Sequence, residues 1–364
     1  MSSQTKIQIP NPKSRKHSKH LNRLKIVGAI LTAFGIGLFA YFVYSVGFYT
    51  IIDGVSKIGF DGFALILGIF FLRICARAAA WKFAVSAPYK LSLRDTIPAV
   101  VIGEATSSLI PLGILVSGTT KAIAVRHRIP LVVGLSSVAT ENLFYSFVTS
   151  TFIIFGAFAF LRTFELDANW VLTIDILISV LIFLLFLGIL MIVRQWHFAS
   201  AICERIYQKG IGVGLLENGR KQVRLFEDFI YGFYRKHPKR FLPIFLCQIA
   251  FHSLGILEAW FILSRISEAI PSFFNSFLLE SVSRLISIVF KLIPFVIGVD
   301  EAGAQFITET LAIGAGVGIT IAIIRKGRIL FWTAIGLLLI IKREISFDDI
   351  KNINQEIQAE NQAN

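Results

Sequence analysis

Three polar side chains that could do chemistry, Glu104, Ser107 and Ser108, lie together in the stretch Gly103–Lys121, which reads GEATSSLIPLGILVSGTTK. A carboxylate can act as a general acid or base, and it can equally pair with a cation. The sequence offers no plausible base that would activate either serine as a nucleophile. We therefore interpret this stretch as part of a polar binding site.

Catalytic and metal-binding motifs are missing from the sequence. It contains no G-x-S-x-G, no H-E-x-x-H, no paired histidine ligands and no aspartate-rich magnesium motif. The three cysteines lack C-x-x-C spacing, and only one of the six histidines, His252, lies in an apolar stretch. We predict no metal, no cofactor and no catalytic residue. Carboxylate acid–base chemistry at Glu104, Glu141 or Glu301 stays open as an alternative.

The elements that must position these residues are membrane helices. The chain has 364 residues, is 55% hydrophobic and contains 34 phenylalanines; its mean hydropathy is +0.71. Apolar runs of about 20 residues recur, which is the length that crosses a bilayer. The net charge of +13 gathers at the ends of these runs, so we predict no nucleic-acid binding. The sequence predicts an all-α, polytopic integral membrane protein with about 7 transmembrane helices plus re-entrant or broken helices.

The chain divides into three parts. Residues 1–25 form a basic tail on the cytoplasmic side, residues 26–341 form the transmembrane domain, and residues 342–364 form a polar, disordered tail. Within the domain, 194–240 is a basic segment that suggests an amphipathic helix on the inner leaflet. The first span is expected at 26–48. We place the protein in the bacterial inner (plasma) membrane with its N-terminus in the cytoplasm.

Arginines and carboxylates recur inside the apolar stretches. Arg73 and Arg77 are four residues apart and share one helix face, and Glu280 and Arg284 have the favourable i, i+4 spacing of an ion pair. Ionisable residues at membrane depth are functional candidates by default. The candidate substrate-binding residues are Arg73, Arg77, Glu104, Ser107, Ser108, Lys121, Glu141, Asn142, Glu280, Arg284, Asp300 and Glu301.

Two interpretations of these charges stay open. In the first, Glu280 and Arg284 are a purely structural pair. In the second, Arg284 contacts a lipid phosphate through charge-assisted hydrogen bonds, while the carboxylates keep the unoccupied cavity neutral. Lys121, together with Arg126 and Arg128, is expected to collect anionic headgroups at the cytoplasmic mouth.

Backbone breaks are expected near the candidate residues. The predicted break positions are Pro111, Gly113, Gly118, Pro294 and Gly298. Broken backbone at membrane depth survives only inside protein or beside a watery cavity, and it often marks a transporter's binding site. We expect a re-entrant hairpin that turns near 111–118. The segments 104–110 and 280–286 share four of seven residues, which is either an internal repeat or coincidence.

The chain resembles the transmembrane, flippase-like region of lysyl-phosphatidylglycerol synthases, and within that superfamily the hopanoid-biosynthesis-associated branch. The resemblance covers roughly residues 25–340. It is carried by Arg73-x-x-x-Arg77-x-x-x-Trp81, Gly103-Glu104-Ala105 with Leu109-Ile110-Pro111, Gly118, Lys121-Ala122, Ile293-Pro294, Gly298-Val299-Asp300-Glu301-Ala302-Gly303, and Arg325-Lys326-Gly327-Arg328 before Trp332 and Gly336.

The resemblance implies an α-helical membrane domain with re-entrant helices that handles lipids between leaflets. The chain departs from the family pattern at Ser107 or Ser108, where the family usually has Asn, and at Val116-Ser117-Gly118, where it usually has Gly-Gly. A tight backbone turn and one hydrogen-bonding amide are therefore in doubt. No polar domain the size of an aminoacyl-transferase remains, so we expect no aminoacylation of lipids.

These observations favour a lipid translocase or lipid-transport protein that is not an enzyme. Its expected partners are membrane lipids, anionic or isoprenoid-type. The first alternative is a non-catalytic membrane partner of a lipid or glycan biosynthetic enzyme, docking through 194–240. The second is a membrane-embedded lipid-modifying enzyme.

Overall fold

The structure, a computed structural model, describes most of the chain between residues 44 and 342. The described residues are 44, 48–109, 113–164, 167–208, 223–224, 227–228, 230–267, 271–290, 298–314 and 316–342. The two predicted tails and the predicted first span at 26–48 lie outside these residues, apart from a few positions at their edges. Pro111 and Pro294, two of the expected break positions, also lie outside them.

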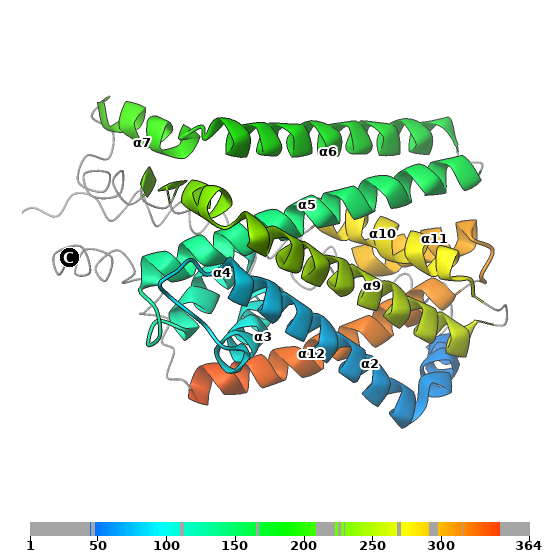
Figure 1. The fold of residues 1–364 in the computed structure, drawn as a ribbon. Helices are drawn as coiled ribbons and strands as arrows, with labels where there is room; N and C mark the ends of the chain where they lie inside the picture. The colour runs from blue at the N-terminus through cyan, green and yellow to red at the C-terminus, as the bar shows by residue number, and fades with distance from the viewer. Residues whose placement is uncertain are drawn as a thin grey trace, which may run out of the picture.

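Helices make up the fold, and the described residues contain no strand. Figure 1 shows their order along the chain. The helices are α2 (Phe48–Ala84), α3 (Leu93–Leu109), α4 (Gly113–Ala124), α5 (Leu131–Thr163), α6 (Ala168–Arg194), α7 (Phe198–Gln208), η1 (Pro238–Arg240), α9 (Phe241–Ile266), α10 (Phe273–Val289), α11 (Val299–Thr310) and α12 (Val317–Lys342). The all-α prediction is confirmed.

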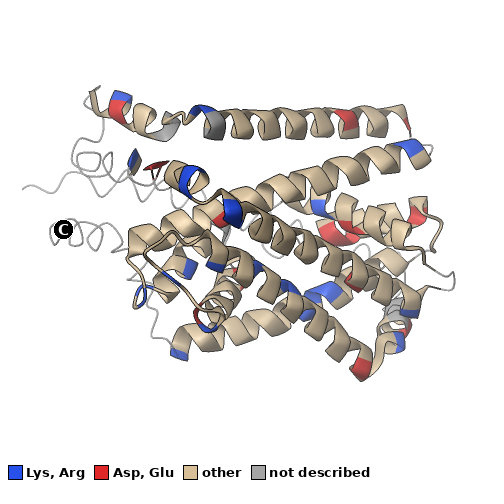
Figure 2. Cartoon of the chain, viewed as in Figure 1, with Lys and Arg blue, Asp and Glu red and all other residues tan. Residues whose placement is uncertain are grey.

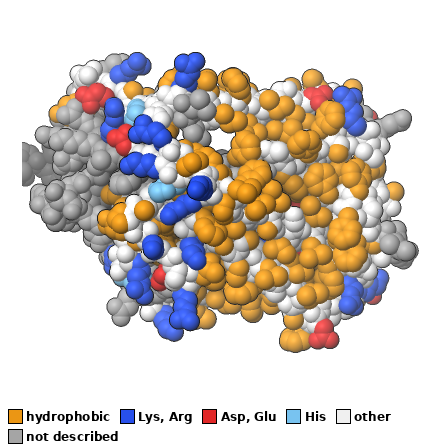
Figure 3. Space-filling view, viewed as in Figure 1, with side chains coloured by type: hydrophobic (Ala, Val, Ile, Leu, Met, Phe, Trp, Pro, Cys, Tyr) orange, Lys and Arg blue, Asp and Glu red, His pale blue; other side chains and the backbone are white. Residues whose placement is uncertain are grey.

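Four of the described helices are long and apolar enough to cross a membrane. They span Val55–Ala84, Leu131–Thr163, Ala168–Met191 and Pro238–Ile266. Figure 3 shows a wide apolar surface over the middle of the molecule, with lysines and arginines gathered toward one end. An apolar surface of this extent, carried by helices of this length, confirms the class of polytopic membrane protein.

Two pairs of shorter helices pack within the frame of long ones. Helices α3 and α4 lie side by side, as do α10 and α11. Figure 1 places the first pair toward one end of the long helices and the second pair toward the other. Glu104 on α3 and Glu280 on α10, the first residues of the two similar segments, therefore approach the interior from opposite halves of the molecule.

Three sequence-based expectations about helix ends are wrong. The charged residues Asp53, Lys57 and Asp61 after the first apolar run predict a short outer loop, but they lie within α2, which has one kink at Gly59, where φ is +65°. Gly118 is not a break, because α4 runs through it without interruption. Gly113, by contrast, is the first residue of α4, and Gly298, with φ +81°, directly precedes α11.

The third correction concerns α12. Its basic residues Arg325, Lys326 and Arg328 follow one apolar run and precede another at 329–341, and this position predicts the cytoplasmic side of the membrane. The structure instead has one continuous helix of 26 residues. At 1.5 Å per residue, Arg328 lies roughly 17 Å from one end of α12 and roughly 21 Å from the other. The helix stays intact because buried carboxylates on neighbouring helices pair with these cations.

Close packing of α11 against α12 depends on Gly318. A Cβ built there would lie 2.4 Å from the backbone of Ala304 and Gln305. Backbone atoms cannot rotate away as a side chain can. A glycine at such a crossing lets two membrane helices approach closely.

We predict that Gly318→Ala lowers the free energy of unfolding by about 1–3 kcal/mol through overpacking. Thermal unfolding of the purified protein in detergent measures this effect. The matched control is Gly188→Ala on α6, where no atom lies within 4 Å of the added Cβ. Equal melting temperatures for the two variants would contradict the packing argument.

Candidate functional site

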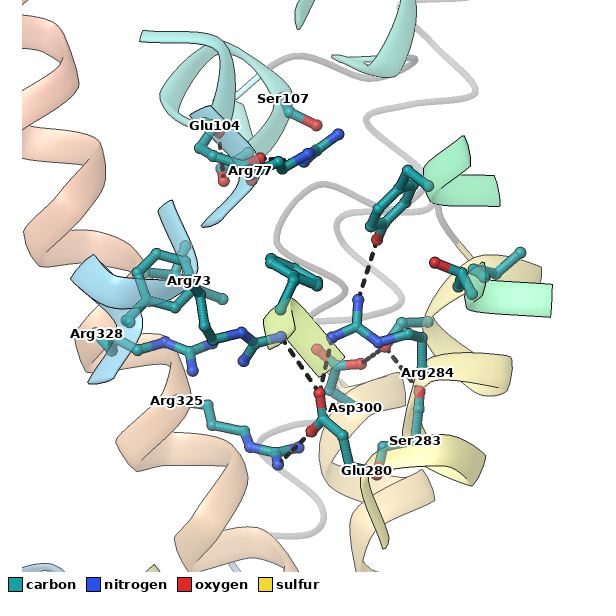
Figure 4. A pocket seen from close by; sticks show the side chains of 18 of the residues that line it. Arg73, Arg77, Glu104, Ser107, Glu280, Ser283, Arg284, Asp300, Arg325 and Arg328 are labelled. Carbon is teal, nitrogen blue, oxygen red and sulfur yellow. Dashed lines mark hydrogen bonds and ion pairs between the residues drawn. The ribbon is translucent and has the colours of Figure 1, made fainter. Parts of the chain in front are cut away.

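A cavity of about 640 Å³ lies between the helices. Helices α2, α3, α5, α10 and α12 contribute most of its wall, with two residues from α11 and single residues from α4, α6 and α9. Figure 4 shows how its charged side chains converge from different helices. The lining also carries many hydroxyl groups, on Ser107, Ser108, Ser117, Tyr145, Ser146, Thr149, Ser150, Ser283, Ser287 and Thr333.

Glu280 is the centre of the first charged cluster. Its carboxylate accepts from Arg284, one turn further along α10, at 2.7 Å and from Arg325 of α12 at 2.7 Å. Arg73 of α2 reaches the same carboxylate at 3.4 Å. Three guanidinium groups from three helices thus share one buried acid, as Figure 4 shows.

A second buried acid, Glu258 of α9, lies behind the cavity wall. Its side chain has no exposed surface, and it pairs with Arg73 at 3.2 Å and with Arg328 of α12. Aromatic rings support the same cations: the guanidinium of Arg328 lies 4.2 Å from the ring centre of Phe70, and that of Arg73 lies 4.5 Å from Phe251. Glu258 and Glu280 together tie α2, α9, α10 and α12 to one another.

Arg77 organises the other end of the cavity. It donates to Glu104 of α3 at 2.5 Å, to Glu141 of α5 at 3.3 Å and to the side-chain oxygen of Asn142 at 3.2 Å. Gln248 of α9 also donates to Glu141, at 3.0 Å. Glu104 keeps 32% of its side chain exposed, the most of the paired carboxylates on the wall.

Lys326 pairs with the two acids at the start of α11. Its ammonium lies 3.6 Å from Asp300 and 3.3 Å from Glu301. Ser287 of α10 donates to Asp300 at 2.8 Å, and the backbone N–H of Gly298 donates to Glu301 at 2.7 Å. The predicted break at Gly298 therefore positions two carboxylates at the beginning of a helix, where the helix dipole favours negative charge.

The cavity surface carries more positive than negative groups. Six cations line it, namely Arg73, Arg77, Arg284, Arg325, Lys326 and Arg328, against three carboxylates, Glu104, Glu280 and Asp300. The other three acids of these clusters, Glu141, Glu258 and Glu301, are at most 1% exposed and stand behind the wall. A cavity with this surface attracts anionic and acceptor-rich groups.

Most of the predicted site residues come together in this one cavity. Arg73, Arg77, Glu104, Ser107, Ser108, Asn142, Glu280, Arg284 and Asp300 line it directly. Glu141 and Glu301 act from behind, as ion-pair partners of lining cations.

Lys121 does not lie at an exposed cytoplasmic mouth. Its side chain is buried, only 2% of the residue is exposed, and it packs against Gly103. Its charge interacts with that of Arg77, which repels it, and with those of Glu141 and Glu104, which attract it. Arg126 and Arg128 are exposed, as expected. Burial follows from the glycine opposite, which leaves space for the long side chain between α3 and α4.

Sequence reasoning missed four ionic members of the site, Glu258, Arg325, Lys326 and Arg328. A lone glutamate in the apolar run 241–263 was a signal for the first, because an uncompensated carboxylate there requires a buried cation. The three basic residues of α12 were noted only as part of a family motif and not as site residues, because in the sequence they resemble the end of a span. Among the described residues, no group of histidine, cysteine and acidic side chains could hold a metal ion.

Comparison with known proteins identifies the family. A sequence model described as the lysylphosphatidylglycerol synthase TM region matches residues 26–336. The chain belongs to this family. The match includes every helix that lines the cavity, although it ends within α12. The family is a membrane region associated with lipids, and the match indicates no catalytic domain. No curated protein and no solved structure matches the chain.

The family resemblance now has a structural counterpart. Eight residues of the lysylphosphatidylglycerol synthase TM region motifs noted in the sequence line the cavity: Arg73, Arg77, Glu104, Asp300, Arg325, Lys326, Arg328 and Trp332. Trp81, one turn beyond Arg77, is buried and donates from its indole nitrogen to Ser137 at 2.9 Å, so it fixes α2 against α5.

We predict that Glu258→Gln lowers the free energy of unfolding by about 3–5 kcal/mol, because it leaves Arg328 buried beside a neutral amide. The control is Asp53→Asn, which removes an exposed ion pair with Lys57 and should change stability by about 0–1 kcal/mol. Thermal unfolding in detergent distinguishes the two. A Glu258→Gln protein as stable as the control would show that the buried network does not hold the helices together.

Proposed function

We propose that the protein moves lipids between the two leaflets of a membrane, with the polar headgroup in the cavity and the tails in the bilayer. The observation that supports this most strongly is the cavity itself, which is lined by charges and hydroxyl groups between helices long enough to span the membrane. A charged group in the centre of a bilayer costs several kcal/mol or more. A cavity whose polar wall binds the headgroup in place of water lowers the free-energy barrier to crossing.

The arrangement of α6 supports a lateral route for the tails. Leu181 of α6 and the exposed Ile288 of α10 belong to the cavity lining. Helix α6 packs mainly against α5 and leaves most of its apolar side chains exposed, including Phe183 and Phe186. Lipid tails can therefore extend from the cavity between α6 and α10 into the surrounding hydrocarbon.

The orientation that we propose puts the basic end in the cytoplasm of a bacterium, with the protein in its inner membrane. Exposed lysines and arginines cluster in the connections before α3, before α5 and before α9, which share one end of the molecule, as Figure 2 shows. Positive residues mark the cytoplasmic side of membrane proteins. An N-terminus in the cytoplasm follows if the chain crosses once between its start and α2.

We propose no catalytic role. The acids that a chemical reaction would need are held in ion pairs: Glu104 with Arg77, Glu141 with Arg77, and Glu301 with Lys326. A general base at one of these positions would first have to leave its cation. The arrangement suits binding and release of a charged group better than proton transfer.

We predict that purified protein in vesicles accelerates the exchange of fluorescent anionic lipid between leaflets, read by a membrane-impermeant quencher. Arg284→Ala should slow exchange by roughly tenfold or more, since a hydrogen bond to a charged group contributes about 1.5–3 kcal/mol. Glu104→Gln should slow it as well, because Arg77 then loses one of the two carboxylates that hold it at the wall.

The matched control for this experiment is Arg265→Ala, which removes an exposed arginine at the end of α9, outside the cavity. It should leave exchange unchanged. If folded wild-type protein accelerates no lipid, autonomous translocation is excluded, and a role as a non-catalytic partner of a biosynthetic enzyme becomes the better proposal.

A further inference from the structure

One end of the cavity holds several buried donors that have no hydrogen-bond partner among the described residues. They are the Nε atoms of Arg73, Arg284 and Arg328, the hydroxyl of Ser283 and the indole nitrogen of Trp332. Arg73 and Arg328 are only 3% and 7% exposed. Buried polar atoms in folded proteins are nearly always partnered, so a group of such donors from α2, α10 and α12 around one cavity indicates a ligand that accepts hydrogen bonds.

The charge at this end indicates an anion. Four guanidinium groups, those of Arg73, Arg284, Arg325 and Arg328, share two carboxylates, Glu280 and Glu258. The pairs of Lys326 with Asp300 and Glu301 adjoin this group, so five cations face four acids and one positive charge is left in excess. A cationic headgroup would be repelled here, and a neutral sugar would leave the excess uncompensated.

Phosphate is the anion that matches these donors. Its oxygens only accept when it is ionised, and it presents more acceptor atoms than a carboxylate. Arginine binds phosphate through paired N–H donors in a fixed plane. Phe70 and Phe251 lie against the faces of Arg328 and Arg73, so the guanidinium edges are left for the ligand.

We infer that Arg73, Arg284, Arg328 and Ser283 form a subsite for a lipid phosphate group, and that Glu280 is the internal counter-ion which the phosphate displaces from Arg73 and Arg284. The inference rests on the proposed function for the lipid part of the ligand. Glu280 keeps Arg325 as a partner after the exchange, because Arg325 contacts its second oxygen, at 2.7 Å. Binding thus replaces one buried ion pair with another and exposes no unpaired charge.

The inference is tested by binding in detergent with three probes: phosphatidic acid, diacylglycerol with the same tails, and inorganic phosphate. Phosphatidic acid should bind at least about tenfold more tightly than either of the others, because only it has both the phosphate and the tails. Arg284→Gln and Ser283→Ala should each lower the affinity for phosphatidic acid, the serine variant by a few-fold. Ser264→Ala, an exposed serine outside the cavity, is the matched control.

Glu280→Gln gives the decisive readout, since it should tighten phosphatidic acid binding several-fold by removing the competing anion. A merely structural role for Glu280 would lower stability and leave affinity unchanged or reduced. If this variant does not fold, Ser283→Ala decides instead, because the wild-type hydroxyl has no partner to lose.

The outcomes separate this inference from the proposed function. Equal affinity for diacylglycerol, or unaltered affinity in Ser283→Ala and Arg284→Gln, overturns the phosphate subsite while translocation of lipids can still be observed in vesicles. Inorganic phosphate that binds as tightly as phosphatidic acid overturns the lipid as ligand. Selective phosphatidic acid binding without any exchange between leaflets supports the subsite and overturns translocation.

Discussion

Charge pairing in apolar surroundings is the constraint on which this structure depends. A guanidinium or carboxylate inside a membrane protein is tolerated only with a partner, because breaking a buried ion pair destabilises the fold by several kcal/mol. Glu258 and Glu280 each accept from arginines on other helices, and Arg77 connects α2 to α3 and α5. Sliding or rotating one of these helices would separate charges, so the pairs fix the register of the bundle where apolar packing alone would tolerate several arrangements.

The same pairs explain why a cavity exists at all. Arginine side chains that converge on a carboxylate cannot interdigitate as closely as leucines and phenylalanines do, and their edges must stay within reach of polar atoms. Aromatic rings cover the flat faces, with Arg77 lying 4.5 Å from the ring centre of Tyr145. Hydroxyl groups from α5 and α10 fill much of the remaining wall. The pairing of buried charges therefore both stabilises the bundle and leaves a polar cavity within it.

The sequence was sufficient for the helical membrane class and for the gathering of Arg73, Arg77, Glu104, Glu280 and Arg284 around one cavity. Composition and spacing carry these conclusions. They could not reveal that α12 is continuous, since a run of basic residues between apolar segments has the same composition as a cytoplasmic loop. Only partners 45 and 70 residues away, Glu280 and Glu258, make those charges compatible with a helix inside the bundle.

Lys121 is a second residue whose place in the structure could not be predicted from sequence composition and spacing. Its position between an apolar run and two exposed arginines is typical of an interfacial lysine. What buries it is the absence of a side chain at Gly103 on the neighbouring helix, together with the acids nearby. One sequence shows that a glycine is present, but the residue that occupies the space beside it depends on tertiary packing.

The position of the basic residues halfway along α12 has an electrical consequence. A polar cavity that reaches the middle of the bundle lets the membrane voltage fall over a shorter distance than the full bilayer, so the remaining field is steeper. Transfer of one elementary charge across the whole voltage is worth about 2.3 kcal/mol per 100 mV. If the protein moves an anionic headgroup, as we propose, then in a cell whose interior is negative this energy favours outward passage of that headgroup and opposes its return.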